Sequence, residues 1–398
     1  MRLLISAMLL TSFIHAQSID GLITYALQKH PSLQSIQQRL LAMDARIAKS
    51  GNWANPEVIL NINDIQFDDP TNRSLEPMQY QAINAKQRFP WFGKSTAKVL
   101  IARAQKGVVL DSYDIARVKL SENIRTTAYT ILEIKERLHI VREYEKITKQ
   151  NIALYTSYTA TDTMSHSNSM AAELMLSRLE IRKERYRSVL KAQEAKLAYL
   201  VQQKNASVTD AFTIQKPRTL SYYLQRIDQN PAYRRMLSQT KVAHANQTLK
   251  ELEKMPDPFV QVGYFNRKEY PDYASVSVGF ALPIYGSETQ EAQAAKKESL
   301  AAQSAALDYK MELESNVATY YAKMQEAYRI YHIIQNESLP KLQHMFELNE
   351  ASIQSGEDLF TYTSLLEQKL DLDEERTVAK AVYLRTRAQL KSLIGEIK

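Results

Sequence analysis

An internal duplication that runs through the whole chain is the feature that most constrains its fold. Each half carries the same landmarks in the same order: a proline where a helix begins, a proline where an alternating segment begins, and a glycine where that segment gives way to a long polar stretch. In the first half these are His30-Pro31, Asn55-Pro56 and Phe89-Pro90-Trp91-Phe92-Gly93. In the second half they are Asn230-Pro231, Asp257-Pro258 and Leu282-Pro283-Ile284-Tyr285-Gly286. The period is far longer than that of solenoid repeats, so we expect two copies of a helix, hairpin and long-helix unit.

Four segments alternate between apolar and small or polar residues, as half-buried strands do. They run over 58–63, 78–82, 260–264 and 275–282. Each extends to about ten residues, the length at which a tilted strand crosses a bilayer. A hairpin of a soluble sandwich is the alternative, although such a core needs further strands to cover it.

Four strands are too few to close a barrel, for which about eight are the practical minimum. Open sheet edges are not tolerated in lipid, because their backbone groups find no hydrogen-bond partners there. If these strands enter a membrane, several chains must therefore share one barrel.

The rest of the chain is predicted to be helical. A helix from Lys94 to about Tyr158 has roughly 65 residues and a length of about 100 Å, and a second runs from Ser287 to about Gln354. Both carry apolar residues at coiled-coil spacing; these are Ile131, Ile134, Leu138, Val141, Val317, Tyr320, Met324, Ala327, Tyr331 and Ile334. Returning helices are expected over 170–203 and 359–393, and Pro340 is expected to bend or loosen the second long helix.

The domain organisation follows from these elements. Residues 1–16 resemble a secretory signal peptide, with Arg2, an apolar core and Ala16 before the cleavage point; a buried N-terminal helix is the alternative. The first repeat spans 17–203, with a β-hairpin at about 56–90 and a helical hairpin at about 94–203. A linker covers 204–217. The second repeat spans 218–398, with a β-hairpin at about 258–283 and a helical hairpin at about 287–395.

Composition argues against several classes of protein. The chain has no cysteine, which removes disulfides and thiolate metal sites. Its net charge of +7 comes from intermixed acidic and basic residues, without the basic block that nucleic-acid binding requires. After the first residues there is no apolar run near the ~20 residues of a membrane helix.

Catalytic and metal-binding patterns are missing from the sequence. There is no nucleophile–base arrangement, phosphate-binding glycine loop or histidine pair at metal-ligand spacing, so we expect no enzyme, no cofactor and no bound metal. Met164, His166 and Met170 cluster near the first helical turn, where soft ligands touch Cu(I) or Ag(I). The alternative is a turn that carries Met and His incidentally.

The chain resembles the TolC-type outer membrane factors over essentially its whole length, from about Ile19 to Gly395. The paired proline and glycine landmarks above carry the resemblance, together with Leu339-Pro340 and the turn at Gly356. Its short loops resemble the heavy-metal efflux branch of that family. The resemblance implies a homotrimer with a twelve-stranded outer-membrane β-barrel and an α-helical tunnel through the periplasm.

The resemblance also assigns roles to particular residues. Strand faces turned outward meet lipid, and the expected wet face carries Gln79, Gln81, Ser275 and Ser277. The expected membrane-interface aromatics are Phe89, Trp91, Phe92 and Tyr285, for which packing at a strand–helix corner is the alternative. The expected periplasmic gate residues are Asn168, Gly356, Glu357 and Asp358. Three copies of Asp358 would form a cation-attracting ring, whereas the alternative is that both acids favour the N-terminus of the returning helix.

The function implied is a passive exit duct of a tripartite efflux system, opened at its tip by a periplasmic adaptor and an inner-membrane pump, most simply a proton-driven one of the RND type. Export by a type I protein secretion system is the alternative within the family. From other classes, a periplasmic adaptor protein would have one helical hairpin and lack the doubled strand pairs. A BAR-like scaffold would need neither a signal peptide nor strands of bilayer length.

Overall fold

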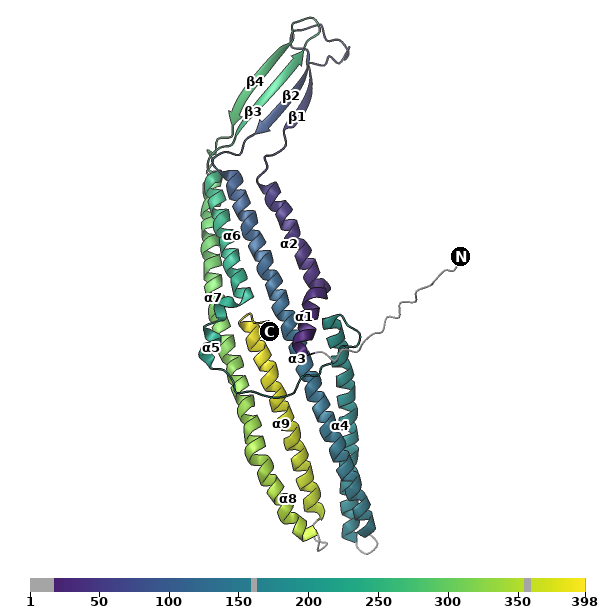
Figure 1. Cartoon of the computed structure of the whole chain (residues 1–398). Helices are drawn as coiled ribbons and strands as arrows, with labels where there is room; N and C mark the ends of the chain where they lie inside the picture. The colour runs from purple at the N-terminus through teal and green to yellow at the C-terminus, as the bar shows by residue number, and fades with distance from the viewer. Residues whose placement is uncertain (1–17, 159–162, 354–358, 398) are drawn as a thin grey trace, which may run out of the picture. The chain divides into compact units, whose positions relative to one another are not determined.

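The structure, a computed structural model, describes residues 18–158, 163–353 and 359–397 (Figure 1). The predicted signal peptide and the turn at Gly356 lie outside these residues. The helices are α1 Ile19–Lys29, α2 Pro31–Ser50, α3 Lys94–Tyr158, α4 Thr163–Val201, α5 Leu220–Leu224, α6 Pro231–Glu253, α7 Ser287–Ile333, α8 Leu339–Ile353 and α9 Leu359–Leu393. The strands are β1 Glu57–Asn63, β2 Tyr80–Arg88, β3 Pro258–Asn266 and β4 Tyr273–Phe280.

The chain forms two compact units, and each takes segments from both predicted repeats. One unit comprises the described parts of Met1–Ser35, Asp114–Pro231 and Lys310–Lys398. The other comprises Ile36–Tyr113 and Ala232–Tyr309, and it contains the sheet. The predicted helix starts are confirmed, because Pro31 begins α2 and Pro231 begins α6, where a missing backbone N–H costs little.

The four strands form one antiparallel sheet in the order β1-β2-β3-β4 (Figure 1). The central pairing of β2 with β3 joins the hairpins of the two repeats and matches Ile83 with Tyr264. Strand lengths of 7, 9, 9 and 8 residues are somewhat shorter than expected from the sequence. Within this sheet, the outer sides of β1 and β4 are unpaired.

The register gives the sheet two chemically distinct faces. One face, here called the apolar face, carries Val58, Leu60, Ile62, Ile83, Ala85, Val260, Val262, Tyr264, Val276, Val278 and Phe280. Its side chains are strongly exposed in the single chain: Leu60 to 75% and Val278 to 71%. The opposite face, here called the polar face, carries Asn61, Asn63, Asn84, Lys86, Gln261, Ser275 and Ser277 among its residues. The prediction of two-faced strands is therefore confirmed, and Ser275 and Ser277 lie on the polar face.

The prediction of which β2 side chains lie on which face of the sheet is wrong. Gln81 pairs with Ile62 and so lies on the apolar face near the strand end, whereas Tyr80 and Ala82 lie on the polar face. The second half of the strand fixes this phase, because Ile83 and Ala85 must alternate with polar neighbours. Gln79 precedes the strand, is buried, and donates hydrogen bonds to the carbonyls of Asp64 and Asn72 in the β1–β2 loop.

The unit without the sheet is built from coiled-coil packing, as predicted. The seam residues Ile131, Ile134, Leu138 and Val141 are all buried on α3, and Val317, Met324 and Ala327 are buried on α7. Residues of α3, α4 and α9 form one apolar cluster: Ile140, Val141, Tyr144, Met175, Leu179, Leu366 and Leu370. The returning helix α4 begins at Thr163, seven residues before the predicted start.

The second long helix departs from α geometry just before Pro340, which confirms the predicted loosening. Residues Ile334–Ser338 form a π-helical segment, in which the N–H of Leu339 donates to the carbonyl of Ile334. Pro340 then falls in the first turn of α8, where its ring is tolerated and its missing N–H costs little.

Among the described helices, none combines the length and the apolar character that a membrane span requires.

Candidate functional site

Two glycines turn the chain from strand into helix at corresponding places in the two repeats. Gly93 has φ +80° and Gly286 has φ +77°, values that residues with a Cβ adopt only with strain. An ion pair between a buried lysine and a half-buried aspartate lies beside the first of them: the Lys94 ammonium lies 2.7 Å from an Asp257 carboxylate oxygen and donates to the Met255 carbonyl at 2.5 Å. Asp257 also accepts a hydrogen bond from the backbone N–H of Trp91. The start of α3 is thereby fastened to the start of β3.

Lys94→Met is expected to lower the free energy of unfolding by about 1–3 kcal/mol, because the charge-assisted hydrogen bonds of its ammonium are lost. Asp257 and the Met255 carbonyl would both lose their ammonium donor. Thermal unfolding in detergent measures the effect. Lys98→Met, one turn later and exposed, is the control and should stay within about 0.5 kcal/mol; equal effects for the two variants would contradict the role given to the ion pair.

Aromatic side chains surround this strand–helix junction and are exposed. Trp91 is exposed to 59% and Tyr285 to 90%, and Phe92 stacks on Trp91 with ring centroids 5.6 Å apart. Phe89 is half-buried and meets the edge of Trp53 at 5.2 Å. The predicted aromatics thus lie together at one end of the sheet. Trp53 was missed, although its position just before the Asn55-Pro56 landmark is a signal that could have identified it.

A network of charged and phenolic side chains ties α9 to α3 and α4. Tyr144 on α3 donates a hydrogen bond to Asp373 at 2.9 Å, and Tyr186 on α4 donates to Glu374 at 2.6 Å. Arg182 adds a bond to Glu374 at 3.0 Å. Burial and the hydrogen bond to Glu374 raise the pKa of Tyr186 to about 12, so its phenol keeps its proton and remains a donor at neutral pH. Burial and Asp373 also raise the pKa of Tyr144.

The sequence contained a signal for this network that our prediction did not use. On α9, Asp373 lies three residues after the buried Leu370 and four before the buried Thr377, which is a seam position. A carboxylate at a seam position is costly to bury unless it is paired and hydrogen-bonded. Lys369 and Arg376 of the same helix pair with Asp373, and Tyr144 adds a hydrogen bond from α3. Such a residue marks a place where helices are tied together by polar contacts.

The predicted gate residues lie at or beyond the limits of the described residues. Gly356, Glu357 and Asp358 lie outside them. Asn168 lies in the first two turns of α4. The structure does not describe its side chain or those of Met164 and His166.

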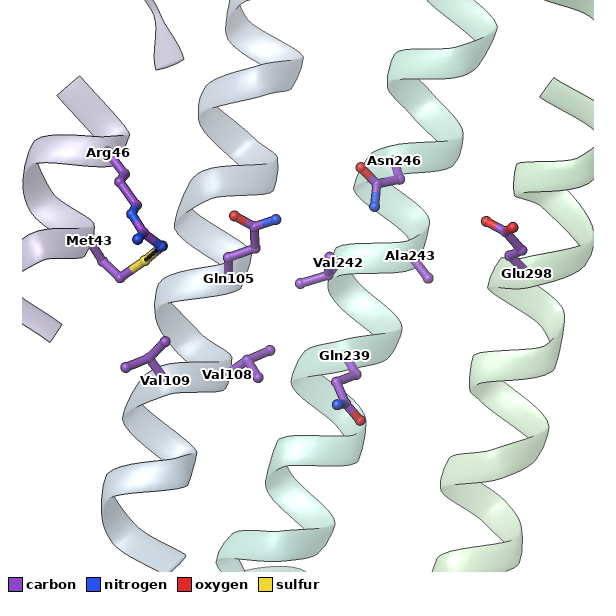
Figure 2. A pocket seen from close by; sticks show the side chains of 10 residues that line it. All are labelled: Met43, Arg46, Gln105, Val108, Val109, Gln239, Val242, Ala243, Asn246 and Glu298. Atoms are coloured by element: carbon purple, nitrogen blue, oxygen red, sulfur yellow. Dashed lines mark hydrogen bonds between the residues drawn. The ribbon is translucent and has the colours of Figure 1, made fainter. Parts of the chain in front are cut away.

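A groove of about 510 Å³ lies in the sheet-containing unit, where α2, α3, α6 and α7 run side by side (Figure 2). Its lining residues are Met43, Arg46, Gln105, Val108, Val109, Gln239, Val242, Ala243, Asn246 and Glu298. Hydrogen bonds hold neighbouring helices in this order: Lys106 to Asp44 between α3 and α2, and Ser238 to Asp111 between α6 and α3. Within the part of the chain that the structure describes, no three His, Cys, Asp or Glu side chains are grouped to hold a metal ion.

Solved structures of outer-membrane channels have the same fold as this chain. CusC, whose structures concern folding and transmembrane channel formation, is 13% identical with a TM-score of 0.79, over 95% of this chain and 92% of its own. The outer membrane protein VceC of Vibrio cholerae is 14% identical with a TM-score of 0.79, over 95% and 96%. The MtrE outer membrane channel of Neisseria gonorrhoeae, in its open state, is 14% identical with a TM-score of 0.78, over 95% and 89%. No protein-family model and no curated protein sequence matches the chain. The predicted fold class, long helical hairpins with a small β part, is confirmed.

Proposed function

We propose that this protein belongs to the TolC-type outer membrane factors and forms a homotrimeric channel in the outer membrane that extends into the periplasm. The proposal rests mainly on the structure of the sheet. It exposes a continuous apolar face, an opposite polar face and two unpaired edges on β1 and β4. In lipid such a sheet must close on itself, and four strands from each of three chains make a twelve-stranded barrel. Its apolar face would meet lipid and its polar face the lumen.

The same proposal explains the exposed aromatics. Trp91, Phe92, Tyr285 and Trp53 gather where the strands meet the helices, which is where a barrel leaves the bilayer. Tryptophan and tyrosine are enriched at that depth, because their rings are amphipathic. We propose these residues, with Phe89, as the periplasmic-side belt of the barrel.

In this role the protein is a passive conduit and not an enzyme. A periplasmic adaptor protein would engage the helical tip, and an inner-membrane pump of the RND type would supply the energy. The alternative that the same fold allows is a role as the outer-membrane component of a type I secretion system. A periplasmic adaptor function is disfavoured, because the sheet here leaves an apolar face uncovered by any described element of the chain.

Reconstitution tests the proposal directly. The purified protein in detergent should have three times the mass of one chain, and in planar bilayers it should produce discrete conductance steps. A stable monomer in the absence of detergent, with no conductance, would contradict the proposal.

For the gate we propose Asp358, with Glu357 beside it, Gly356 as the turn that permits movement, and Asn168 as the counterpart in the first hairpin. Asp358→Ala should reduce the preference for cations over anions in bilayer recordings. A unit charge about 4 Å from an ion contributes about 1 kcal/mol in water, which corresponds to roughly fivefold in that preference. Glu337→Ala, which removes the same charge from an exposed position before α8, is the control. Unchanged selectivity in Asp358→Ala would remove this residue from the gate.

A further inference from the structure

Three aromatic rings cluster on the polar face of the sheet, close to the loops that join the strands. Phe265 on β3 stacks on Tyr273 of β4, with centroids 4.6 Å apart and planes 3° apart. Tyr80 on β2 meets the edge of Phe265 at 5.0 Å. We call Tyr80, Phe265 and Tyr273 the aromatic patch. The register places all three on the face opposite to Val262, Tyr264 and Val276.

The sheet is shaped to hold these rings against it. A Cβ at Gly263 would lie 2.8 Å from the Phe265 ring and 2.4 Å from Oδ1 of Asn84, so a larger residue would displace one of them. Ala82, the cross-strand partner of Phe265, is small and buried. The patch is therefore a built feature of the polar face, yet Tyr273 stays exposed to 40%.

Aromatic rings are unexpected here, because the lumen face of a membrane barrel is normally polar. The rings contribute nothing to contact with lipid, since the apolar face carries that role. The 40% exposure of Tyr273 leaves part of its ring open to solutes, and planar aromatic molecules gain about 0.5–1.5 kcal/mol from each offset-stacked or edge contact.

Charges of both signs lie around the patch. The Arg267 guanidinium lies 5.0 Å from the Tyr273 ring centroid and 5.6 Å from that of Tyr270. Lys86 and Arg88 lie on the same face but toward the opposite end of β2 from Tyr80, beside Phe259. In the loop beside the patch, Asp272 accompanies Arg267: its carboxylate accepts a hydrogen bond from the Arg267 backbone N–H at 2.9 Å. Positive charge therefore does not predominate at the patch, and ring stacking rather than charge sets the class of solute.

We propose that the aromatic patch is a binding site in the channel lumen for planar aromatic solutes. The inference rests on the proposed function, because it takes the polar face to line the lumen of a trimeric barrel. Three patches would then form a collar at the outer end of the barrel. The collar implies organic export substrates rather than metal ions.

Block of the channel current by a matched pair of probes tests the proposal. In planar bilayers, 2-naphthalenesulfonate added on the side of the strand loops should reduce the current at concentrations at least about fivefold lower than cyclohexanesulfonate requires. The two probes carry the same charge and differ in the planar aromatic system. This comparison uses the parent protein and so needs no variant to fold.

Two variants locate the site. Phe265→Leu combined with Tyr273→Leu should weaken block by 2-naphthalenesulfonate about fivefold or more and leave cyclohexanesulfonate unaffected. Tyr264→Leu is the matched control, because Tyr264 adjoins Phe265 in β3 but lies on the apolar face. It should leave both probes unaffected. Unitary conductance equal to that of the parent shows that each variant has assembled.

Failure of the aromatic site and failure of the proposed channel function give different outcomes. Equal block by the two probes, or unchanged block in the double variant, would overturn the aromatic site while the channel itself stands. Loss of block in Tyr264→Leu alone would overturn the assignment of the patch to the lumen. Absence of any conductance in the parent protein would overturn the proposed function and the site with it.

Discussion

Val276→Arg is expected to abolish assembly of the channel in the membrane, whereas Ser277→Arg is expected to leave it intact. Val276 lies near the middle of β4 on the apolar face and is exposed to 70% in the single chain. An arginine at the lipid-facing midplane of a barrel costs about 2–4 kcal/mol. Three copies in a trimer would cost about 6–12 kcal/mol, which is comparable to the whole stability of a typical domain of about 5–15 kcal/mol.

Ser277 is the matched control, because it is the next residue of the same strand and lies on the polar face beside Gln261. An arginine there would extend into a wet lumen and keep its hydration. Recovery of trimer from the outer-membrane fraction, followed by bilayer recording, measures both variants. If Ser277→Arg lost assembly and Val276→Arg kept it, the two faces would be assigned the wrong way round. If both variants assembled equally well, the sheet would not form part of a barrel wall that faces lipid.

The assignment of strand side chains to the two faces shows what the sequence could and could not predict about this sheet. In β4, Val276, Val278 and Phe280 alternate without interruption, and the predicted face is right. In β2 the apolar–polar alternation of the first residues, Tyr80 to Ala82, is shifted by one residue from that of Ile83 and Ala85. A local pattern of a few residues cannot settle such a conflict. Pairing with β1 and β3 settles it, because a shift by one residue would turn Ile83 and Ala85 to the wet face.

Helical features were easier to predict, because their signals repeat over many turns. The ends of α3 at Lys94 and Tyr158 match the prediction, and the buried seam from Ile131 to Val141 follows from apolar spacing alone. The partners of polar side chains were not predictable in this way. Tyr144 and Asp373 are 229 residues apart, and only the packing of α9 on α3 brings them together.

Glu374→Ala is the second variant for which we expect a large effect. Its carboxylate is largely buried, accepts hydrogen bonds from Tyr186 and Arg182, and lies 3.8 Å from Arg137. Removing one member of a buried charged group leaves its partners uncompensated, at a cost of about 3–5 kcal/mol. Because the Arg182 side chain is still 34% exposed, we expect about 2–4 kcal/mol here. The midpoint of thermal unfolding in detergent measures this loss.

Glu367→Ala is the control on the same helix. Glu367 pairs with Arg178 at 3.3 Å, but both side chains are well exposed, at 43% and 59%. Exposed ion pairs contribute about 0–1 kcal/mol, so this variant should unfold close to the parent. Comparable losses for Glu374→Ala and Glu367→Ala would show that the buried network contributes no more than a surface pair.

The same pair of variants connects stability to channel opening. The network ties α9 of the second helical hairpin to α3 and α4 of the first. As part of the proposed function, we propose that opening of the tip moves these helices relative to one another. On this proposal the open arrangement lacks these contacts, so weakening them should raise the fraction of time that a reconstituted channel spends in its high-conductance state. Glu374→Ala should show this increase and Glu367→Ala should not. An unstable Glu374→Ala channel with unchanged gating would assign the network to folding alone.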